Sequence, residues 1–339
     1  MLNRLVRTTG LLIVFGLSAA LLMLFSNGRG AAQTSGSGNV VSSVFTRNPL
    51  QVALLQWYPA NLVTSFAAGV GAERVAFDGA NIWVTNAGDS NNGTTVTKMS
   101  ANDGTLLGTF EVGAAPVGIA YDGANMWVSD YAGNMVSKVR ASDGAVLGKF
   151  PTGAGPGWVV FDGAHIWTSN YLDNNVTKLR ASDGAVLANY TVGLNPAGIA
   201  FDGFHIWVVN ISGGNVTELN ASDGTVTGTF PVGHAPYDIA FDGTNMWVSN
   251  FGSDTLTKLN GVDGSSLGTF PTGSGPYGVV YDGANIWVAN SGDNTVTKLR
   301  ANTGTNMGTF GVGAGPNGIV FDGTNVWVAN NTSNTVSKL

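Results

Sequence analysis

Residues 278–310 read GVVYDGANIWVANSGDNTVTKLRANTGTNMGTF and contain one complete structural unit. Segments rich in β-forming residues alternate with Gly, Asn and Asp turns, which predicts strands at 278–282, 285–290, 295–300 and 305–310. We label these strands a, b, c and d. An Asp-Gly pair joins strand a to strand b, because glycine accepts the positive φ of a tight hairpin turn and aspartate bonds the turn backbone.

The same unit recurs along the chain. A tryptophan of strand b marks each copy, at intervals of 40 residues and once of 44: Trp83, Trp127, Trp167, Trp207, Trp247, Trp287 and Trp327. A four-stranded unit of about 40 residues is typical of a β-propeller blade. The 339-residue chain has 49 glycines and no cysteine, which excludes a coiled coil and a disulfide scaffold. We expect the repeated tryptophans to be core residues.

The two ends of the repeat indicate how the array closes. The last copy supplies strands a, b and c and stops at Leu339 without a strand d. Residues 62–66 have the spacing of a strand d, yet no blade precedes them. We therefore predict an all-β, seven-bladed β-propeller with four-stranded blades over residues 61–339, closed by strand 62–66 completing the last blade. An open solenoid, the alternative for such a repeat, has no reason to divide one unit between its ends.

The first sixty residues differ from the rest. Residues 1–32 combine Arg4 and Arg7 with an apolar stretch of 16 residues, which predicts a signal peptide or, alternatively, an uncleaved N-terminal anchor. Residues 33–60 form a Ser/Gly-rich linker and an apolar lead-in. The protein is therefore expected to be exported to the periplasm, the cell surface or the medium. Membrane contact is expected only through an uncleaved anchor.

The charged residues are few and scattered. Fifteen basic and 21 acidic residues give a formal charge of −6, and no basic cluster follows the N-terminus, so we expect no nucleic-acid partner. His165 and His205 replace an asparagine of the other a–b turns and are expected to be turn residues. Asp89 lies in a four-residue insertion in the 88–94 region, which lacks the carboxylate spacing of a calcium loop and is expected to be a surface loop. We predict no metal site, no cofactor and a monomer.

Segments such as IWVANSGDNTVTKL and VGAGPNGIVFDG resemble the seven-bladed YVTN or YncE-like propellers. They are also similar, more broadly, to WD40-like propellers and to the streptogramin B (virginiamycin B) lyases. The resemblance covers residues 62–339. It implies that strand a lines a central channel, that strand d is outermost, and that the d–a and b–c loops share the ligand-binding face. For a lyase it further implies histidine and glutamate around Mg²⁺.

The copies differ from one another on that face. The residue two positions after the d–a loop proline is glycine in most copies and is replaced in the others. Such aromatic and polar substitutions suit a small molecule, a glycan or a protein at the channel mouth. The b–c loops add an apolar arc. The predicted binding residues are Arg74, Trp158, His234, Tyr237, Asp238, Tyr277 and Asn317 on the d–a side, and Tyr131, Tyr171 and Phe251 on the b–c side.

These observations favour a binding or interaction module that uses the face of the d–a and b–c loops, rather than an enzyme. One alternative is a lyase-like enzyme of the streptogramin B lyase type with Mg²⁺, in which His234 is the catalytic candidate beside Glu73 or Asp238. The histidine and glutamate set of those lyases cannot be matched residue by residue. The other alternative is a structural cell-surface repeat protein.

Overall fold

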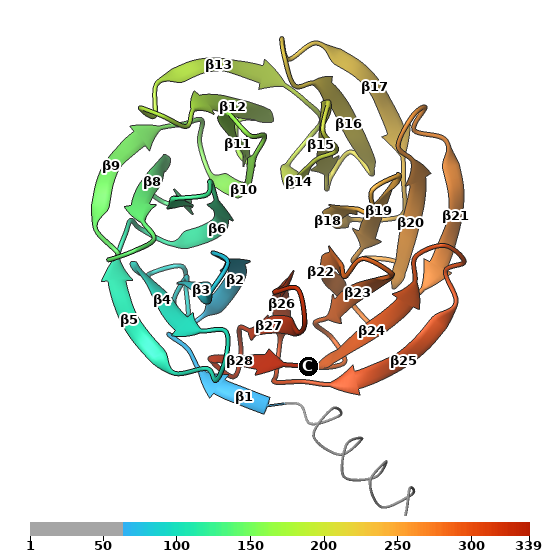
Figure 1. Ribbon diagram of the computed structural model, residues 1–339. Coiled ribbons are helices and arrows are strands. Elements are labelled where there is room, and N and C mark those ends of the chain that lie inside the picture. The colour runs from blue at the N-terminus through green and yellow to red at the C-terminus, as the bar shows by residue number, and fades with distance from the viewer. Residues whose placement is uncertain (1–63) are drawn as a thin grey trace, which may run out of the picture. The chain divides into compact units, whose positions relative to one another are not determined.

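The computed structural model describes residues 64–339, in which seven four-stranded antiparallel sheets stand around a central axis (Figure 1). This arrangement confirms the all-β, seven-bladed propeller. Within the described range there is no helix that could span a membrane. The predicted signal peptide or anchor at 1–32 and the linker at 33–60 lie outside the described residues.

In six blades the strands run outward from the centre in chain order, and in the seventh the outermost strand is the first described strand of the chain (Figure 1). The innermost strands (a) are β2 (Ala72–Phe77), β6 (Pro116–Tyr121), β10 (Pro156–Phe161), β14 (Pro196–Phe201), β18 (Pro236–Phe241), β22 (Pro276–Tyr281) and β26 (Pro316–Phe321). The b strands are β3 (Asn81–Asn86), β7 (Asn125–Asp130), β11 (His165–Asn170), β15 (His205–Asn210), β19 (Asn245–Asn250), β23 (Asn285–Asn290) and β27 (Val326–Asn330). The c strands are β4 (Thr95–Ser100), β8 (Met135–Arg140), β12 (Asn175–Arg180), β16 (Asn215–Asn220), β20 (Thr255–Asn260), β24 (Thr295–Arg300) and β28 (Thr335–Lys338). The outermost strands (d) are β5 (Leu106–Glu111), β9 (Val146–Pro151), β13 (Val186–Thr191), β17 (Val226–Pro231), β21 (Ser266–Pro271), β25 (Asn306–Gly311) and β1 (Thr64–Ala67).

The ring closes through the first and last described strands. β1 pairs antiparallel with β28, with Phe66 opposite Val336, so the orphan strand completes the seventh blade. The strand begins at Thr64, and residues 62 and 63 of the predicted strand lie outside the described residues. Phe66 also stacks on Trp327 at 5.6 Å between ring centroids, and the d-strand aromatic ring of each other blade lies 5.2–5.6 Å from its own tryptophan ring. Closure in this way leaves no open sheet edge at the junction.

Each blade is held by a repeated set of contacts around its tryptophan. In blade 2, Trp127 is fully buried and its Nε1–H donates to Asp122 Oδ2 at 2.7 Å. The Phe150 ring lies 5.6 Å from the Trp127 ring, and the Lys138 ammonium lies 5.0 Å from its centroid. The same ammonium donates to the carbonyl oxygen of Ala181 in the next blade at 2.7 Å. The turn aspartate, the tryptophan and the lysine therefore serve packing within and between blades.

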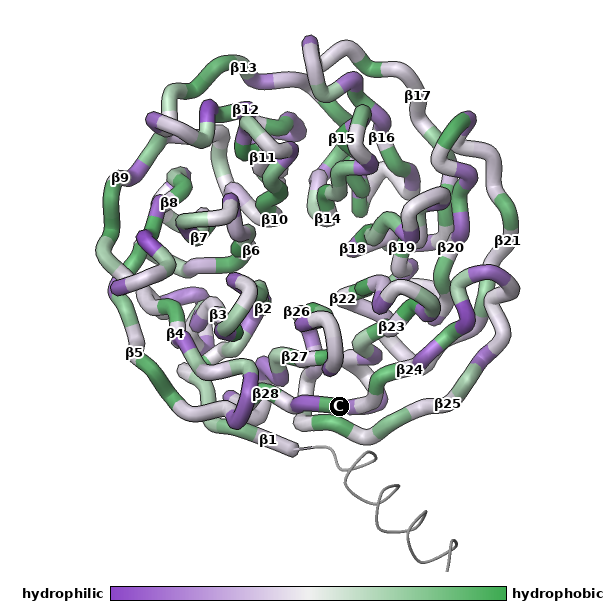
Figure 2. Tube along the Cα trace, viewed as in Figure 1, coloured by the Kyte–Doolittle hydropathy of each residue, from purple (hydrophilic) through white to green (hydrophobic). Residues whose placement is uncertain are grey.

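Loops connect the strands on two faces of the ring. On one face the b–c loops bond to the d–a loops, as in the bond from the Tyr131 N–H to the Ala115 carbonyl. On the other face the a–b turns bond to the c–d turns, as in the bond from the Ala101 N–H to the Ala80 carbonyl. Figure 2 shows hydrophilic residues gathered at these turns and loops. The structure thus confirms the expected pairing of loops and places functional candidates on two separate faces.

An asparagine at the end of strand b ties it to strand c in six blades. In blade 7, Asn330 Nδ2 donates to Ser337 Oγ at 2.9 Å. Blade 2 has Asp130 instead, which accepts a 2.7 Å bond from Ser137 Oγ and leaves its Oδ1 buried without a partner among the described residues. Burial raises the pKa of Asp130 to about 6, and the bond from Ser137 only partly opposes this rise. An ionised Asp130 therefore destabilises the folded protein.

Asp130→Asn is expected to stabilise the protein at pH 8 by about 1–3 kcal/mol, because a rise in pKa from 3.8 to about 6 corresponds to roughly 3 kcal/mol at most. The folded wild type binds this proton more tightly than the unfolded chain. Its penalty is therefore absent below about pH 4, grows as the pH rises to about 6, and is constant above. Urea unfolding of both proteins at pH 4 and pH 8 measures the difference. An equal gain at both pH values would contradict the assignment.

Candidate functional site

The centre of the ring is crowded where the seven a strands converge. A Cβ atom at Gly278 would collide with the Asn317 carbonyl oxygen, and one at Gly118 would collide with the Gly157 carbonyl oxygen. Glycine therefore occupies this repeat position in blades 2, 4, 6 and 7, because no side chain fits between neighbouring backbones there. The remaining three blades fill the centre with Arg74, Trp158 and Asp238.

Those three side chains form one cluster in the channel. Arg74 Nη1 lies 3.1 Å from Asp238 Oδ2, and Trp158 Nε1–H donates to Asp238 Oδ1 at 3.0 Å. The Arg74 guanidinium carbon lies 4.2 Å from the centroid of the Trp158 ring, within the range of a cation–π contact. Arg74 is 6% exposed and Asp238 is 8% exposed. This cluster fills the channel beneath the mouth.

The buried ion pair has strong electrostatic consequences. Burial raises the pKa of Asp238, and the charge of Arg74 opposes that rise together with bonds from the N–H groups of Ile239 and Val279. Burial alone would lower the pKa of Arg74, but Asp238, Tyr277, Glu73 and Tyr237 together outweigh it and the net direction is upward. Arg74 Nε and Nη2 have no hydrogen-bond partner among residues 64–339. The guanidinium of this ion pair therefore retains two donor nitrogens without partners among residues 64–339.

A second layer lies around Glu73, which neighbours Arg74 on β2. Asn317 Nδ2 and Asn331 Nδ2 each donate to Glu73 Oε2 at 2.9 Å. The Tyr277 hydroxyl lies 3.1 Å from Glu73 Oε1 and 2.5 Å from the Tyr237 hydroxyl. Burial raises the pKa of Tyr277 well above its usual value, and the Glu73 charge adds to this effect. Both phenols are therefore neutral hydrogen-bonding groups.

Above these layers lies a cavity of about 550 Å³. Glu73, Trp158, Tyr237 and Tyr277 belong to its lining, which places the second layer at its floor. The Trp158 and Tyr237 rings meet edge to face at 5.1 Å, and the Tyr237 and Tyr277 rings lie 3.9 Å apart. The walls come from b–c loops, namely Tyr131, Tyr171, Ile211, Asn331 and the insertion at 88–91. The site therefore combines aromatic faces with a fixed carboxylate.

The structure brings most of the predicted binding residues together. Trp158, Tyr237, Tyr277, Tyr131 and Tyr171 line the cavity. Arg74, Asp238 and Asn317 are buried and support the floor. Phe251 packs 6.2 Å from the Tyr237 ring at the edge of the aromatic group and is 43% exposed.

His234 lies apart from the cavity. It is exposed on its d–a loop, beside Gly252, and does not belong to the lining. Glu73 and Asp238 are held by other partners, Asn317 and Asn331 for the first and Arg74 and Trp158 for the second. The acid–base pair expected for His234 is therefore not formed.

Two contributors were absent from the predicted binding residues. Glu73 was named only as a possible acid–base partner of His234, although it occupies the same variable repeat position as Tyr237, Tyr277 and Asn317. The insertion in the 88–94 region was expected to be a surface loop and was not among the predicted binding residues. Instead, Asp89, Ser90 and Asn91 line the cavity, because the four extra residues lengthen a b–c loop on the same face.

Comparison with known proteins finds relatives in fold only. No protein-family model and no curated protein sequence matches the chain. A streptogramin B lyase structure is 17% identical, covers 82% of this chain and 96% of that one, and has a TM-score of 0.70. Virginiamycin B lyase from Staphylococcus aureus is 16% identical over 82% of this chain and 98% of its own, also at 0.70. Kuenenia stuttgartiensis hydrazine synthase is 17% identical over 79% and 95%, at 0.70. The chain is thus a β-propeller whose fold is similar to that of the streptogramin B lyases.

Proposed function

We propose that this protein is an exported binding module that takes a small hydroxyl-bearing ligand, such as a glycan, into the cavity at the channel mouth. The observation that carries the proposal is the fixed Glu73 carboxylate among the Trp158, Tyr237 and Tyr277 rings. The composition of residues 1–32 supports export. The binding face is the one formed by the d–a and b–c loops.

The chemistry of the cavity favours such a ligand. A volume of about 550 Å³ falls within the range of small-molecule sites. Aromatic faces offer apolar contact area with little loss of side-chain freedom. Glu73 is oriented by two asparagine amides and accepts hydrogen bonds, and hydroxyl groups donate them. A saccharide presents an apolar ring face and several hydroxyl donors, which matches both parts of the site.

Glu73→Gln is expected to weaken ligand binding by roughly 10-fold or more, because a hydrogen bond to a charged group contributes about 1.5–3 kcal/mol. The full-length protein is first screened on an array of neutral and amino oligosaccharides, and the strongest ligand is then measured by calorimetry. Glu111→Gln on the outer strand β5, where Glu111 is exposed, is the matched control and should bind as the wild type does. Thermal unfolding checks that both variants fold.

The proposal fails if no oligosaccharide binds saturably, or if Glu73→Gln binds as tightly as the wild type. Binding of a protein instead of a sugar, with the same dependence on Glu73, would keep the site and correct the ligand class.

A lyase activity is the second candidate, because the similar solved structures include virginiamycin B lyase, one inactive variant of which was solved with quinupristin. His234 lies outside the cavity, so a lyase here would need a different base. Incubating the protein with quinupristin, with and without Mg²⁺, tests this candidate. A linear product would favour the lyase. Recovery of intact quinupristin would count against the lyase and favour the binding module. Ordered self-assembly of the purified protein would instead favour a structural cell-surface role.

A further inference from the structure

A cation stands over the tryptophan ring in six of the seven blades. The lysine ammonium groups lie 4.5 to 5.1 Å from the ring centroids. Most of them also donate to a carbonyl oxygen of the following blade, as Lys258 does to Ala301 at 2.8 Å. Lys258 Nζ lies 3.9 Å from Asp242 Oδ2 of its own a–b turn. In the repeat, a positive charge therefore lies between the aspartate of the a–b turn, the indole ring of strand b and a carbonyl group of the neighbouring blade. The six lysines are Lys98, Lys138, Lys178, Lys258, Lys298 and Lys338.

Blade 4 alone inverts the charge at this position. Glu218 of β16 replaces the lysine and pairs with Trp207 in the strand register. His205 of β15 replaces the asparagine found in most blades. In the following blade, Gly261 stands where the others have alanine as the carbonyl acceptor. The ammonium is thus lost and a carboxylate is gained beside the retained Asp202.

The three side chains converge on one point. His205 Nδ1 lies 3.2 Å from Asp202 Oδ2 and 3.4 Å from Glu218 Oε1. One ligand atom from each residue lies within 4.8 Å of the other two. Asp202 Oδ2 also accepts a 2.8 Å bond from Trp207 Nε1–H, which fixes its orientation. Together the three residues offer one imidazole nitrogen and two carboxylate oxygens, a set of atoms that commonly binds metal ions.

The Glu218 carboxylate is the independent sign that a ligand is required. Its side chain is 8% exposed. Among residues 64–339 no group donates a hydrogen bond to this carboxylate, which contacts the His205 imidazole at 3.4 Å and has a second carboxylate, Asp202, within 4.8 Å. A buried carboxylate without donors is costly unless a cation neutralises it. The other six blades have a lysine ammonium at the equivalent position. Blade 4 has no lysine there, so the positive charge must come from another source.

We propose that Asp202, His205 and Glu218 bind a first-row divalent metal ion of the Zn²⁺ type on the face of the a–b and c–d turns. An imidazole nitrogen with two carboxylates suits Zn²⁺ and its neighbours, whereas Ca²⁺ and Mg²⁺ prefer oxygen-only sets. The ion supplies the positive charge that lysine supplies elsewhere. This site lies on the opposite face from the glycan cavity, so it is independent of the proposed function.

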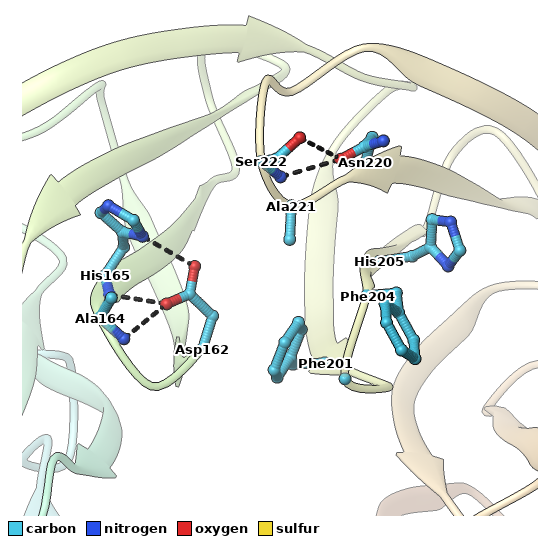
Figure 3. Close-up of a pocket in the computed structure, with 10 residues that line it drawn as sticks. Asp162, Ala164, His165, Phe201, Phe204, His205, Asn220, Ala221 and Ser222 are labelled. Atoms are coloured by element: carbon cyan, nitrogen blue, oxygen red, sulfur yellow. Dashed lines mark hydrogen bonds and ion pairs between the residues drawn. The ribbon is translucent and has the colours of Figure 1, made fainter.

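The site opens to solvent at its histidine. His205 also borders a cavity of about 570 Å³ between blades 3 and 4, together with Phe204 and His165, but Asp202 and Glu218 do not line that cavity (Figure 3). The imidazole of His205 is 32% exposed, whereas Asp202 and Glu218 are nearly covered. Figure 3 also shows His165 bonded to Asp162 in blade 3. That blade retains Lys178, so it is a natural control with the same histidine and aspartate but no glutamate.

The test uses untagged full-length protein, stripped with a chelator and titrated with Co²⁺ by visible absorption and with Zn²⁺ by calorimetry. We expect one equivalent of either ion to bind. Glu218→Lys and His205→Asn restore the residues of the other blades and should fold without metal, yet each should lose that equivalent. Lys178→Glu should complete a second set in blade 3 and raise the stoichiometry to two.

Thermal unfolding gives a second readout. Zn²⁺ should raise the melting temperature of the wild type and leave that of Glu218→Lys unchanged, because only the folded wild type holds the site. The alternative occupant is a proton on His205 between the two carboxylates. In that case metal and chelator leave the wild type unchanged, and the proposal is overturned. Zn²⁺ binding that persists in Glu218→Lys, or a single equivalent in folded Lys178→Glu, also overturns it.

Discussion

Asp238→Ala should lower the free energy of unfolding by about 3–5 kcal/mol, because it leaves the buried Arg74 guanidinium without its counter-charge. Arg74 and Asp238 are joined at 3.1 Å, with side chains 8% and 12% exposed. The substitution also removes the acceptor of the Trp158 indole N–H. Urea unfolding followed by circular dichroism at pH 7 measures the loss.

An exposed pair provides the matched control. Arg140 and Asp143 form a 2.8 Å ion pair whose side chains are about half exposed. Asp143→Ala should change stability by no more than about 1 kcal/mol, because exposed pairs contribute little. If the two alanine variants lose similar amounts of stability, the channel pair does not act as a buried ion pair.

The double variant Arg74→Met with Asp238→Leu separates a lost charge from lost packing. It removes both charges at similar volume and should recover much of the stability that Asp238→Ala loses. Arg74→Met alone leaves Asp238 unpaired. Because burial raises the pKa of that carboxyl, this variant should be less destabilised at acidic pH, where Asp238 binds a proton.

The fold was predictable because the repeat imposes the same packing on every copy. Strand b of the quoted unit was predicted at 285–290, and β23 has these bounds. Strand a was predicted at 278–282, whereas β22 begins at Pro276. The difference arises because Pro276 already pairs with Asn290, ahead of an irregularity in the register. The divided seventh blade was also readable, since a closed ring explains both chain ends.

The candidate site was predictable only as a set of positions. Arg74, Trp158 and Asp238 break the symmetry of the glycine position, so they could be found from the copies alone. Which of these side chains contact one another could not be predicted from the sequence. Arg74 and Asp238 are 164 residues apart and meet across the channel, and no spacing rule relates opposite blades.

The blade 4 cluster illustrates the same limit. His205 was predicted to be a turn residue, and its backbone N–H does donate to Asp202 Oδ1 at 2.6 Å. Its approach to Glu218 depends on the neighbouring strand and was not visible in the turn pattern. The fold thus gives one histidine both a local role and a contact across the sheet.

Trp127→Ala should lower the free energy of unfolding by about 3–5 kcal/mol, the usual cost of truncating a fully buried aromatic residue. The cavity would separate the Phe150 ring from its partner at 5.6 Å and remove the face on which the Lys138 ammonium rests at 5.0 Å. It would also leave Asp122 Oδ2 without its indole donor. Urea unfolding measures the loss, and Trp158→Ala, at a half-buried position, should cost less.

Trp127→Phe separates the ring from its N–H group. It retains most of the apolar volume and should cost about 1–3 kcal/mol, because the indole donor to Asp122 is lost.

Burial alone would raise the pKa of Asp122, but the bond from Trp127 and those from the Ala124 and Asn125 N–H groups outweigh it and lower the pKa. This contribution is present above about pH 4 and is lost as the pH falls through the folded-state pKa of Asp122. The difference between wild type and Trp127→Phe should therefore shrink in acid, while the loss in Trp127→Ala should persist because it arises mainly from the cavity. If the loss in Trp127→Phe is the same at every pH, the indole N–H does not act through the Asp122 carboxylate, and the repeated aspartate needs another explanation.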